Sequence, residues 1–326
     1  MIPNKPTLCG TALTSTCSTV RKNLVLAFFW VGLNSLWSMP VQAEPPLMKI
    51  QILGSGGPEL TDRRASTSYL IWLNGKARLL VDTGPGSSLH FEQSGAQLND
   101  LDAVLYTHFH VDHSSDLPAF IKAAYFTGRN RDLYLYGPTS NALMPSATDF
   151  IDGLFGVHGI YRYLSEYLQP GESSLYKIRP VDIIAAGDKA TVLALPGQIT
   201  ASAVPVHHGP LPALAWRIDV DGCSVTFSGD TNNAGARLER LAQDTDLFIV
   251  HHAIPENAGA TARNLHMTPS MIGKTVHNAG AKKLLLSHRM QRTEGMETET
   301  LQEIRKTFQG PVEFADDLAV YEPCLP

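Results

Sequence analysis

Residues 107–113, Thr-His-Phe-His-Val-Asp-His, place three histidines and an aspartate within six consecutive positions. The segment follows a short apolar run, residues 103–106 (AVLY), which is typical of a buried strand. Neutral imidazoles bind zinc and neighbouring transition metals, and a carboxylate adds a hard oxygen ligand. A solvated histidine-rich loop would need neither the strand nor further ligands downstream. The segment therefore predicts a metal site at the end of a strand.

The rest of the chain alternates short apolar runs with turns. Asn74-Gly75 and Asp221-Gly222 each separate two such runs, which is a strong hairpin signal. Several runs end in histidine or aspartate, so the pattern favours an α/β fold, an αβ/βα sandwich with its site along one rim. Strands are predicted at 48–54, 68–73, 77–81, 103–106, 132–136, 201–206, 213–220, 223–228, 248–252 and 283–288, and helices at 117–126 and 268–279.

No repeat or polar linker divides residues 44–326, which predicts a single domain. Residues 144–180 fit the alternating pattern less well, because several aromatic residues stand there among turn residues. We interpret this stretch as a helical insertion near the mouth of the site. Ordinary packing of these aromatic side chains on the core is the alternative.

The first 43 residues have the features of a cleaved signal peptide. A basic segment ends at Lys22, the apolar run 24–37 follows, and Val41-Gln42-Ala43 has the small-x-small form of a cleavage site. The apolar run is too short for a membrane span, although an uncleaved anchor is the alternative. No later stretch is long and apolar enough to span a membrane. The sequence therefore predicts a periplasmic or secreted protein.

Composition bears on the partners. The 326 residues are 44% hydrophobic with a formal net charge of -5, so no basic face for nucleic acid is indicated. We therefore predict no nucleic-acid partner, while anionic substrates stay open, because bound metal ions would supply local positive charge. Outside the leader only Cys223 and Cys324 remain, and their spacing leaves open whether they form a disulfide.

Further motifs stand on both sides of the cluster at 108–113. In chain order they are Gly54-Ser55-Gly56-Gly57, Asp82-Thr83-Gly84, Val206-His207-His208-Gly209, Phe227-Ser228-Gly229-Asp230-Thr231 and Leu286-Ser287-His288. With these motifs in this order, the chain resembles the metallo-β-lactamase superfamily, whose signature is HxHxDH. The resemblance extends from Leu53 to about His288. Members of this family often form homodimers, and no sequence feature decides whether this protein does.

The resemblance implies a site for two Zn²⁺ ions, where manganese or iron would also fit. His207 competes with His208 for one ligand position, and the following glycine favours His208. Asp82 is expected not to bind a metal itself but to contact and orient a histidine that does. The implied ligands are His108, His110 and His208 for one metal, Asp112, His113 and His288 for the other, and Asp230 as the bridge between them.

Two branches of the superfamily match best, ribonuclease Z and the zinc-type arylsulfatases. In the ribonuclease Z branch a histidine at the position of His266 donates a proton to the leaving oxygen, so we take His266 and Asp112 as catalytic residues. Three features depart from ribonuclease Z: the export signal, a bare hairpin turn where that branch carries a long tRNA-binding arm, and His252 where it has a glutamate. The histidine-glycine-proline run at 208–210 is closer to the arylsulfatases.

The resemblance therefore implies, as the leading hypothesis, an exported binuclear zinc hydrolase whose substrate is a small anionic ester of sulfate or phosphate. A hydroxide held between the metals is the expected nucleophile. The alternatives are a ribonuclease Z-type phosphodiesterase, a lactone or thioester hydrolase, and a non-catalytic metal-binding protein. β-Lactamase activity is disfavoured, since Asp230 stands where those enzymes usually carry cysteine.

Overall fold

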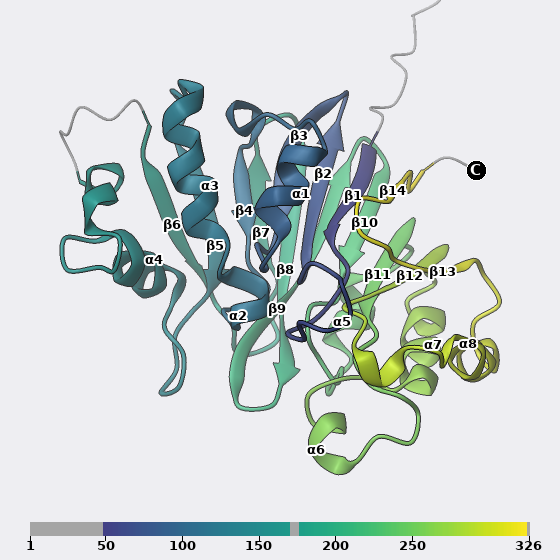
Figure 1. The fold of residues 1–326 in the computed structure, drawn as a ribbon. Coiled ribbons are helices and arrows are strands. Elements are labelled where there is room, and N and C mark those ends of the chain that lie inside the picture. Colours follow the sequence, from purple (N-terminus) through teal and green to yellow (C-terminus); the bar gives the residue numbers. More distant parts are fainter. Residues whose placement is uncertain (1–47, 170–175, 325–326) are drawn as a thin grey trace, which may run out of the picture. The chain divides into compact units, whose positions relative to one another are not determined.

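The computed structural model describes residues 48–169 and 176–324. Two seven-stranded β-sheets pack face to face, and helices cover the outer face of each sheet (Figure 1). The predicted signal peptide, residues 1–43, lies outside the described residues and stays a prediction. Among the described helices, none has the length and apolar character needed to cross a membrane.

The first sheet has the strand order β14-β1-β2-β3-β4-β5-β6. From β14 to β3 neighbouring strands pair antiparallel, and from β3 to β6 they pair parallel. The strands and the helices of this half are β1 (Met48–Gly54), β2 (Ser68–Leu73), β3 (Lys76–Val81), α1 (Ser87–Gln93), β4 (Ala103–Leu105), α2 (Val111–Ser114), α3 (Leu117–Ala124), β5 (Leu133–Pro138), α4 (Ala147–Phe155), β6 (Ile178–Ile183) and β14 (Val320–Tyr321).

The second sheet has the order β13-β12-β11-β10-β9-β8-β7. Its antiparallel half contains the predicted hairpin at Asp221-Gly222, and its other half is parallel. The elements are β7 (Thr191–Leu195), β8 (Ile199–His208), β9 (Leu211–Val220), β10 (Cys223–Phe227), α5 (Arg237–Leu241), β11 (Leu247–His251), α6 (Ala260–Arg263), α7 (Pro269–Asn278), β12 (Lys283–Ser287), α8 (Glu297–Arg305) and β13 (Val312–Phe314).

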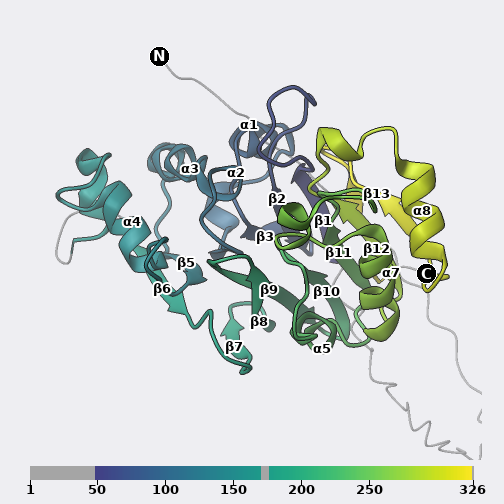
Figure 2. The ribbon, with the colours of Figure 1, turned by 90° about the horizontal axis from the view of Figure 1, so that it is seen from below.

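Three apolar layers hold these elements together. The central layer lies between the sheets and includes Tyr69 and Trp216, both fully buried. A second layer packs α1, α3 and α4 on the first sheet, and a third packs α5, α7 and α8 on the second (Figure 2). This is the predicted αβ/βα sandwich. Because both sheets end at a common rim, side chains that follow their strands come together there.

Residues 144–180 hold α4, a 3-10 turn at Arg162–Tyr167 and the start of β6, and residues 170–175 are outside the described part. Phe155 is fully buried, and the Phe150 ring stacks on Phe109 with centroids 4.5 Å apart. Several of the aromatic side chains therefore pack on the core. The strand β6 went unpredicted because Pro180 interrupts its pattern, yet an edge strand tolerates proline.

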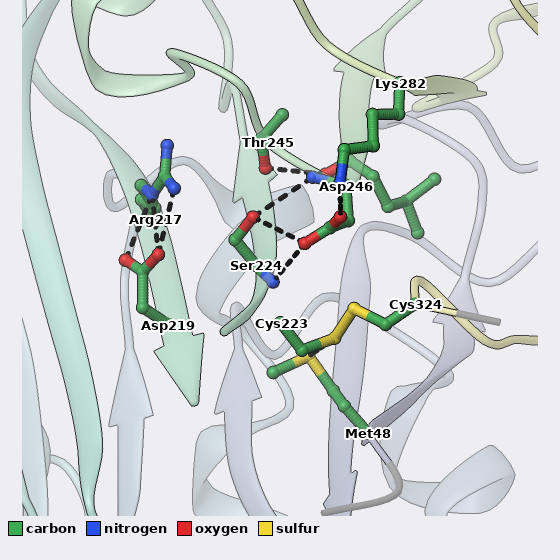
Figure 3. Close-up of a disulfide and its surroundings, with 10 residues drawn as sticks. Met48, Arg217, Asp219, Cys223, Ser224, Thr245, Asp246, Lys282 and Cys324 are labelled. Atoms are coloured by element: carbon green, nitrogen blue, oxygen red, sulfur yellow. Dashed lines mark hydrogen bonds and ion pairs between the residues drawn. A yellow bond between two sulfur atoms is a disulfide. The ribbon is translucent and has the colours of Figure 1, made fainter. Parts of the chain in front are cut away.

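A disulfide joins Cys223, the first residue of β10, to Cys324, beyond β14 (Figure 3). The sulfur of Met48 lies 3.9 Å from the Cys223 sulfur. Beside the bridge, Asp246 accepts hydrogen bonds from the Ser224 backbone N–H at 2.8 Å and from its hydroxyl at 2.9 Å. The bridge therefore ties the C-terminal segment to the second sheet.

Replacing Cys223 and Cys324 together with serine should lower the free energy of unfolding by about 2–4 kcal/mol, because the disulfide restricts the unfolded chain. Urea unfolding followed by circular dichroism measures this. Reductant should lower the free energy of unfolding of the wild type to that of the double variant and leave the stability of the variant unchanged. Equal stabilities in oxidising buffer would contradict the expectation.

Candidate metal centre

The predicted ligands meet at the rim where the strands of both sheets end. From the first sheet, the segment after β4 supplies His108 and His110, and the one-turn helix α2 carries Asp112 and His113. The second sheet contributes side chains at or just beyond the ends of four strands: His208 on β8, Asp230 after β10, His251 on β11 and His288 after β12.

One group comprises His108, His110, His208 and Asp230, and their candidate ligand atoms all lie within 4.8 Å of one another. The His208 Nε2 is 3.4 Å from the His110 Nδ1 and 3.5 Å from the Asp230 Oδ2. The same Oδ2 is 3.8 Å from the His108 Nε2. These separations suit three imidazoles and a carboxylate that converge on one cation.

A second group comprises His113, Asp230, His251 and His288, again within 4.8 Å. Asp230 belongs to both groups, as a bridging residue must. Asp112 is not part of this tightest set, but its Oδ2 lies 3.2 Å from the His288 Nε2 and 3.5 Å from the His113 Nε2. The structure therefore brings together every ligand predicted from the sequence and places His251 beside them.

Three ring nitrogens at the centre of these groups, the Nε2 atoms of His108, His113 and His288, are buried without a hydrogen-bonding partner among the described residues. Buried polar atoms are normally paired, since an unpaired one costs about 1–3 kcal/mol. Convergent unpaired imidazole nitrogens beside two aspartates fit a pair of divalent cations, which would take these lone pairs. The donor set fits zinc and does not by itself fix the metal.

The electrostatics of two members, His108 and Asp230, agree with this donor set. Burial lowers the pKa of His108 well below its ordinary value, assisted by the neighbouring imidazoles His113 and His208, so its lone pair is free to bind a cation. Burial opposes the charged form of Asp230, but His288 and His266 hold its pKa well below the ordinary range. Asp230 is therefore a carboxylate, the form that a metal binds.

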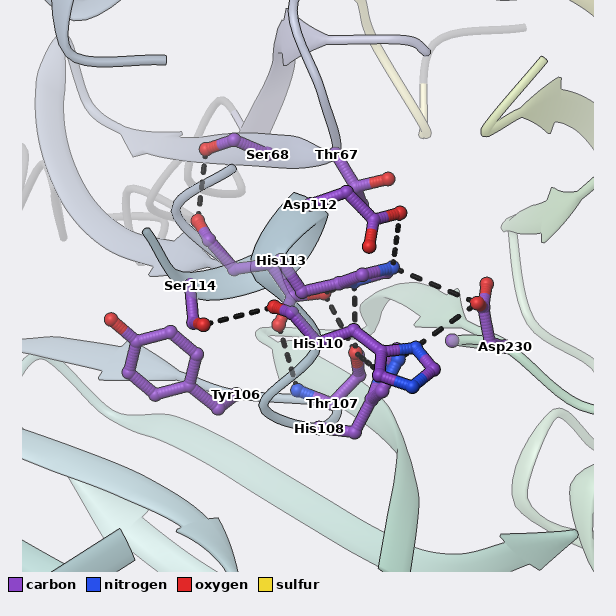
Figure 4. Close-up of polar contacts among 12 residues, drawn as sticks. Thr67, Ser68, Tyr106, Thr107, His108, His110, Asp112, His113, Ser114 and Asp230 are labelled. Atoms are coloured by element: carbon purple, nitrogen blue, oxygen red, sulfur yellow. Dashed lines mark hydrogen bonds and ion pairs between the residues drawn. The ribbon is translucent and has the colours of Figure 1, made fainter. Parts of the chain in front are cut away.

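Asp82 lies behind the cluster, fully buried after β3 (Figure 4 shows its partners Thr107 and His113). Its Oδ2 is 2.8 Å from the His113 Nδ1 and accepts a hydrogen bond from the Thr107 hydroxyl at 2.7 Å, and its Oδ1 accepts one from the Thr107 backbone N–H at 2.8 Å. With Nδ1–H donating to Asp82, the His113 Nε2 is directed at the cluster. Both Asp82 (φ 59°) and His288 (φ 52°) adopt left-handed backbone, a strain that concentrates at functional sites.

An Asp82→Asn substitution should weaken zinc binding by about 10–100-fold, because the amide keeps the shape but removes the charge that orients His113. Competition with a chromogenic zinc chelator measures the affinity. Asp246→Asn, which changes a buried aspartate in the second sheet, is the matched control and should bind zinc like the wild type. Unchanged affinity in Asp82→Asn would remove this residue from the orienting role.

Of the two adjacent histidines at the end of β8, the structure brings His208 into the cluster. His208 is buried, and its Nδ1 lies 3.0 Å from the Leu265 carbonyl oxygen, to which it donates. His207 instead lines a separate cavity of about 320 Å³ together with Asn141 and Arg237. Neighbouring residues of a strand face opposite sides, so only one of the pair can reach the cluster.

His266 lies at the opening of the cluster. It lines a cavity of about 130 Å³ with His110, Asp112, His208, Asp230, His288 and Arg292, among others. Its Nδ1 is buried, has no hydrogen-bonding partner among the described residues and lies 3.9 Å from the Asp230 Oδ1. Burial lowers the pKa of His266 to about 4. The predicted proton donor therefore faces the space where a substrate would meet the cluster.

His252, which replaces the family's glutamate, faces elsewhere. Its Nε2 is 3.0 Å from the Thr300 hydroxyl on α8, and its ring lies against Phe314. The residue that contacts Asp230 is its neighbour His251, which the sequence analysis missed. In the structure Leu247 and Ile249 face the layer between the sheets, and alternation along β11 places His251 on that same face.

Curated relatives match nearly the whole described part of the chain. The ribonuclease Z of Methanosarcina acetivorans is 24% identical over 308 residues, which cover 85% of this chain and 98% of that protein. The ribonuclease Z of Myxococcus xanthus is 26% identical over 298 residues, with 83% and 96% covered.

These relatives show that the prediction against a nucleic-acid partner, and for a small ester in its place, is wrong, since their name denotes enzymes that act on RNA. That prediction relied on the net charge of -5. Net charge does not decide this question, because phosphate recognition depends on local charge, and the guanidinium of Arg292 lines the cavity beside the cluster.

Solved structures share the fold. The metallo-β-lactamase fold protein YhfI of Bacillus subtilis superposes with a TM-score of 0.65 at 22% identity, covering 86% of this chain and all of that one. The short form of human tRNase Z gives 0.66 at 18% identity, covering 85% and 100%. The family model of the metallo-beta-lactamase superfamily matches residues 61–267, more than half of the chain. The chain therefore belongs to the metallo-β-lactamase superfamily, and it is a metal-dependent hydrolase that acts on ester bonds.

Proposed function

We propose that this protein is a binuclear zinc phosphodiesterase that hydrolyses phosphodiester bonds in RNA. The observation that carries the proposal is the cavity of about 130 Å³ in which His266 and Arg292 face the shared histidine and aspartate cluster. The names of the curated relatives support the ribonuclease Z-type alternative over the leading hypothesis of a hydrolase that acts on small sulfate or phosphate esters.

The zinc ligands follow from the two groups. We assign three histidines of the first group to one zinc ion and three residues on α2 and after β12 to the other. A carboxylate common to both groups is assigned as the bridge. The assigned ligands are His108, His110 and His208; Asp112, His113 and His288; and Asp230 as the bridge. Two bound divalent cations would lower the pKa of an attacking water and neutralise the phosphoryl oxygens.

His266 serves as the proton donor to the leaving oxygen. A buried imidazole with a pKa near 4 is neutral in the free protein. A phosphodiester bound in the cavity brings negative charge next to the ring, and a nearby opposite charge favours the protonated form. The substrate thus supplies the condition under which His266 can act as a general acid.

Arg292 binds the substrate anion. Its Nε donates a hydrogen bond to the Ala253 carbonyl oxygen at 2.6 Å, which fixes the side chain at the cavity. A guanidinium placed there can donate further hydrogen bonds to phosphate oxygens beside the scissile bond. The β9–β10 hairpin has only Asp221 and Gly222 at its turn.

A parallel assay tests the proposed reaction. The purified, zinc-loaded protein is offered a short RNA oligonucleotide, bis(4-nitrophenyl) phosphate, 4-nitrophenyl phosphate and 4-nitrophenyl sulfate. We expect turnover of both diesters, and loss of that turnover on chelation. Sulfate turnover above diester turnover would instead make the protein an arylsulfatase. Absence of turnover with all four substrates would overturn the proposal and favour a lactone or thioester hydrolase.

We also propose that the protein is exported after cleavage between Ala43 and Glu44. The basic and apolar leader supports this, and the Cys223–Cys324 disulfide is of the kind that persists in oxidising compartments. In an exporting bacterial host, N-terminal sequencing of the accumulated protein should give Glu44. An intact Met1 on a membrane-bound form would contradict cleavage.

A further inference from the structure

The two carboxylate oxygens of Asp230 have different neighbours. The Oδ2 lies 3.5–3.8 Å from the Nε2 atoms of His208, His113 and His108, and so faces both ligand groups at once. The Oδ1 lies 2.7 Å from the Nδ1 of His251, within hydrogen-bonding distance, and 3.3 Å from the Nε2 of His288. The Oδ2 is thus the oxygen that faces both ligand groups, while the shortest contact of the Oδ1 is the one to His251.

His251 is occupied at both ring nitrogens, since its Nε2 lies 3.0 Å from the hydroxyl of Tyr69. Ionised Asp230 can only accept, so the His251 Nδ1 must carry the hydrogen and donate it. The Nε2 of the neutral ring then accepts from the Tyr69 hydroxyl. All three side chains are buried, and Tyr69 lies on β2 of the opposite sheet.

We propose that His251, itself fixed by Tyr69, is a positioning residue that reserves one oxygen of Asp230 for both metal ions. Without the Nδ1–H bond, the carboxylate could rotate and offer both oxygens to a single cation, which would remove the bridge. The inference rests on the metal site of the proposed function and not on its substrate.

The alternative is that His251 is itself a metal ligand, because its ring belongs to the second group. A ligand needs a free lone pair, however, and the Nδ1 that faces the Asp230 Oδ1 at 2.7 Å must bear a proton. The Nε2 lone pair is used by Tyr69. The geometry therefore favours a hydrogen bond to the bridge over a bond to the metal.

Zinc titration of the purified protein against a chromogenic chelator, without substrate, tests this inference. We expect His251→Ala to weaken the second zinc equivalent by about 10–100-fold, the range for residues that orient ligands. His251→Asn, whose side-chain N–H can replace Nδ1–H, should recover most of that loss. Tyr69→Phe should weaken the same equivalent by a smaller factor, because the histidine loses its anchor.

Two matched variants control for a general loss of packing. His252→Ala removes the adjacent buried histidine, which bonds Thr300, and Tyr106→Phe removes the hydroxyl of a buried tyrosine that bonds Thr83 at 2.9 Å. Both should bind zinc like the wild type. Equal weakening in these controls, or full affinity in both His251→Ala and Tyr69→Phe, would overturn the inference.

X-ray absorption at saturating zinc separates the positioning role from the ligand role. The number of imidazole ligands per zinc should be the same in wild type and His251→Ala, and a loss of one would make His251 a ligand. A wild type that binds no zinc would remove the metal site itself, before any variant is compared. Intact zinc binding without diester turnover would overturn the proposed function alone.

Discussion

Asp230→Asn should lower diester turnover by at least about a thousandfold and leave the protein with fewer than two tightly bound zinc equivalents. The substitution keeps the size of the side chain but removes the one negative charge shared by both ligand groups. Single preorganised charged or polar groups already contribute about 10²–10³ in rate, and this one also holds the metals. Steady-state kinetics on bis(4-nitrophenyl) phosphate, with metal content measured on the same samples, gives both quantities.

The control for this variant is Asp246→Asn, a buried aspartate of the same sheet that bonds Ser224 and Lys282. It should retain both zinc equivalents and turnover, because its partners lie away from the rim. Melting temperatures in chelator show whether Asp230→Asn still folds. Near-normal turnover with two zinc ions bound in Asp230→Asn would contradict the bridging assignment.

His266→Ala should slow RNA cleavage by about 10²–10⁴-fold, the usual contribution of a general acid. The loss on bis(4-nitrophenyl) phosphate should be less than about tenfold, since nitrophenolate leaves without a proton. The contrast between the two substrates is the measurement. His266 suits this test because its Nδ1 has no partner among the described residues and faces the cavity.

Equal losses on both substrates would remove His266 from proton donation and leave it a binding role. His277→Ala changes an exposed histidine on α7 and is the control, which should turn over both substrates at the wild-type rate. Measuring kcat separately from KM distinguishes a slower chemical step from weaker RNA binding.

Much of the fold was predictable because its central strands are apolar runs with clear turns. The strand at 48–54 has the predicted bounds, and the helix predicted at 268–279 is observed at Pro269–Asn278. The unpredicted strands β6, β7, β13 and β14 lie at sheet edges. Edge strands are short, half-exposed or interrupted by proline, so their periodicity is weak and tertiary pairing decides them.

The site was predictable where the chain itself brings residues together, as in 107–113. For two pairs of adjacent histidines, only the structure shows which member lies at the cluster. His208 rather than His207 faces the cluster, and His251 rather than His252 contacts Asp230. In both pairs the strand alternates its side chains between faces, and the sequence does not say which face meets the other sheet.

The ligands come from two sheets, and this arrangement has a consequence for the lifetime of the protein. A zinc ion held by His108 and His208 would crosslink the two sheets, which pack on each other through an apolar layer. Free zinc at 1,000 times its dissociation constant would add about 4.1 kcal/mol to the folded state. Where zinc is scarce, the apoprotein would open more often and would be degraded sooner, so the supply of zinc would set how much of the protein accumulates.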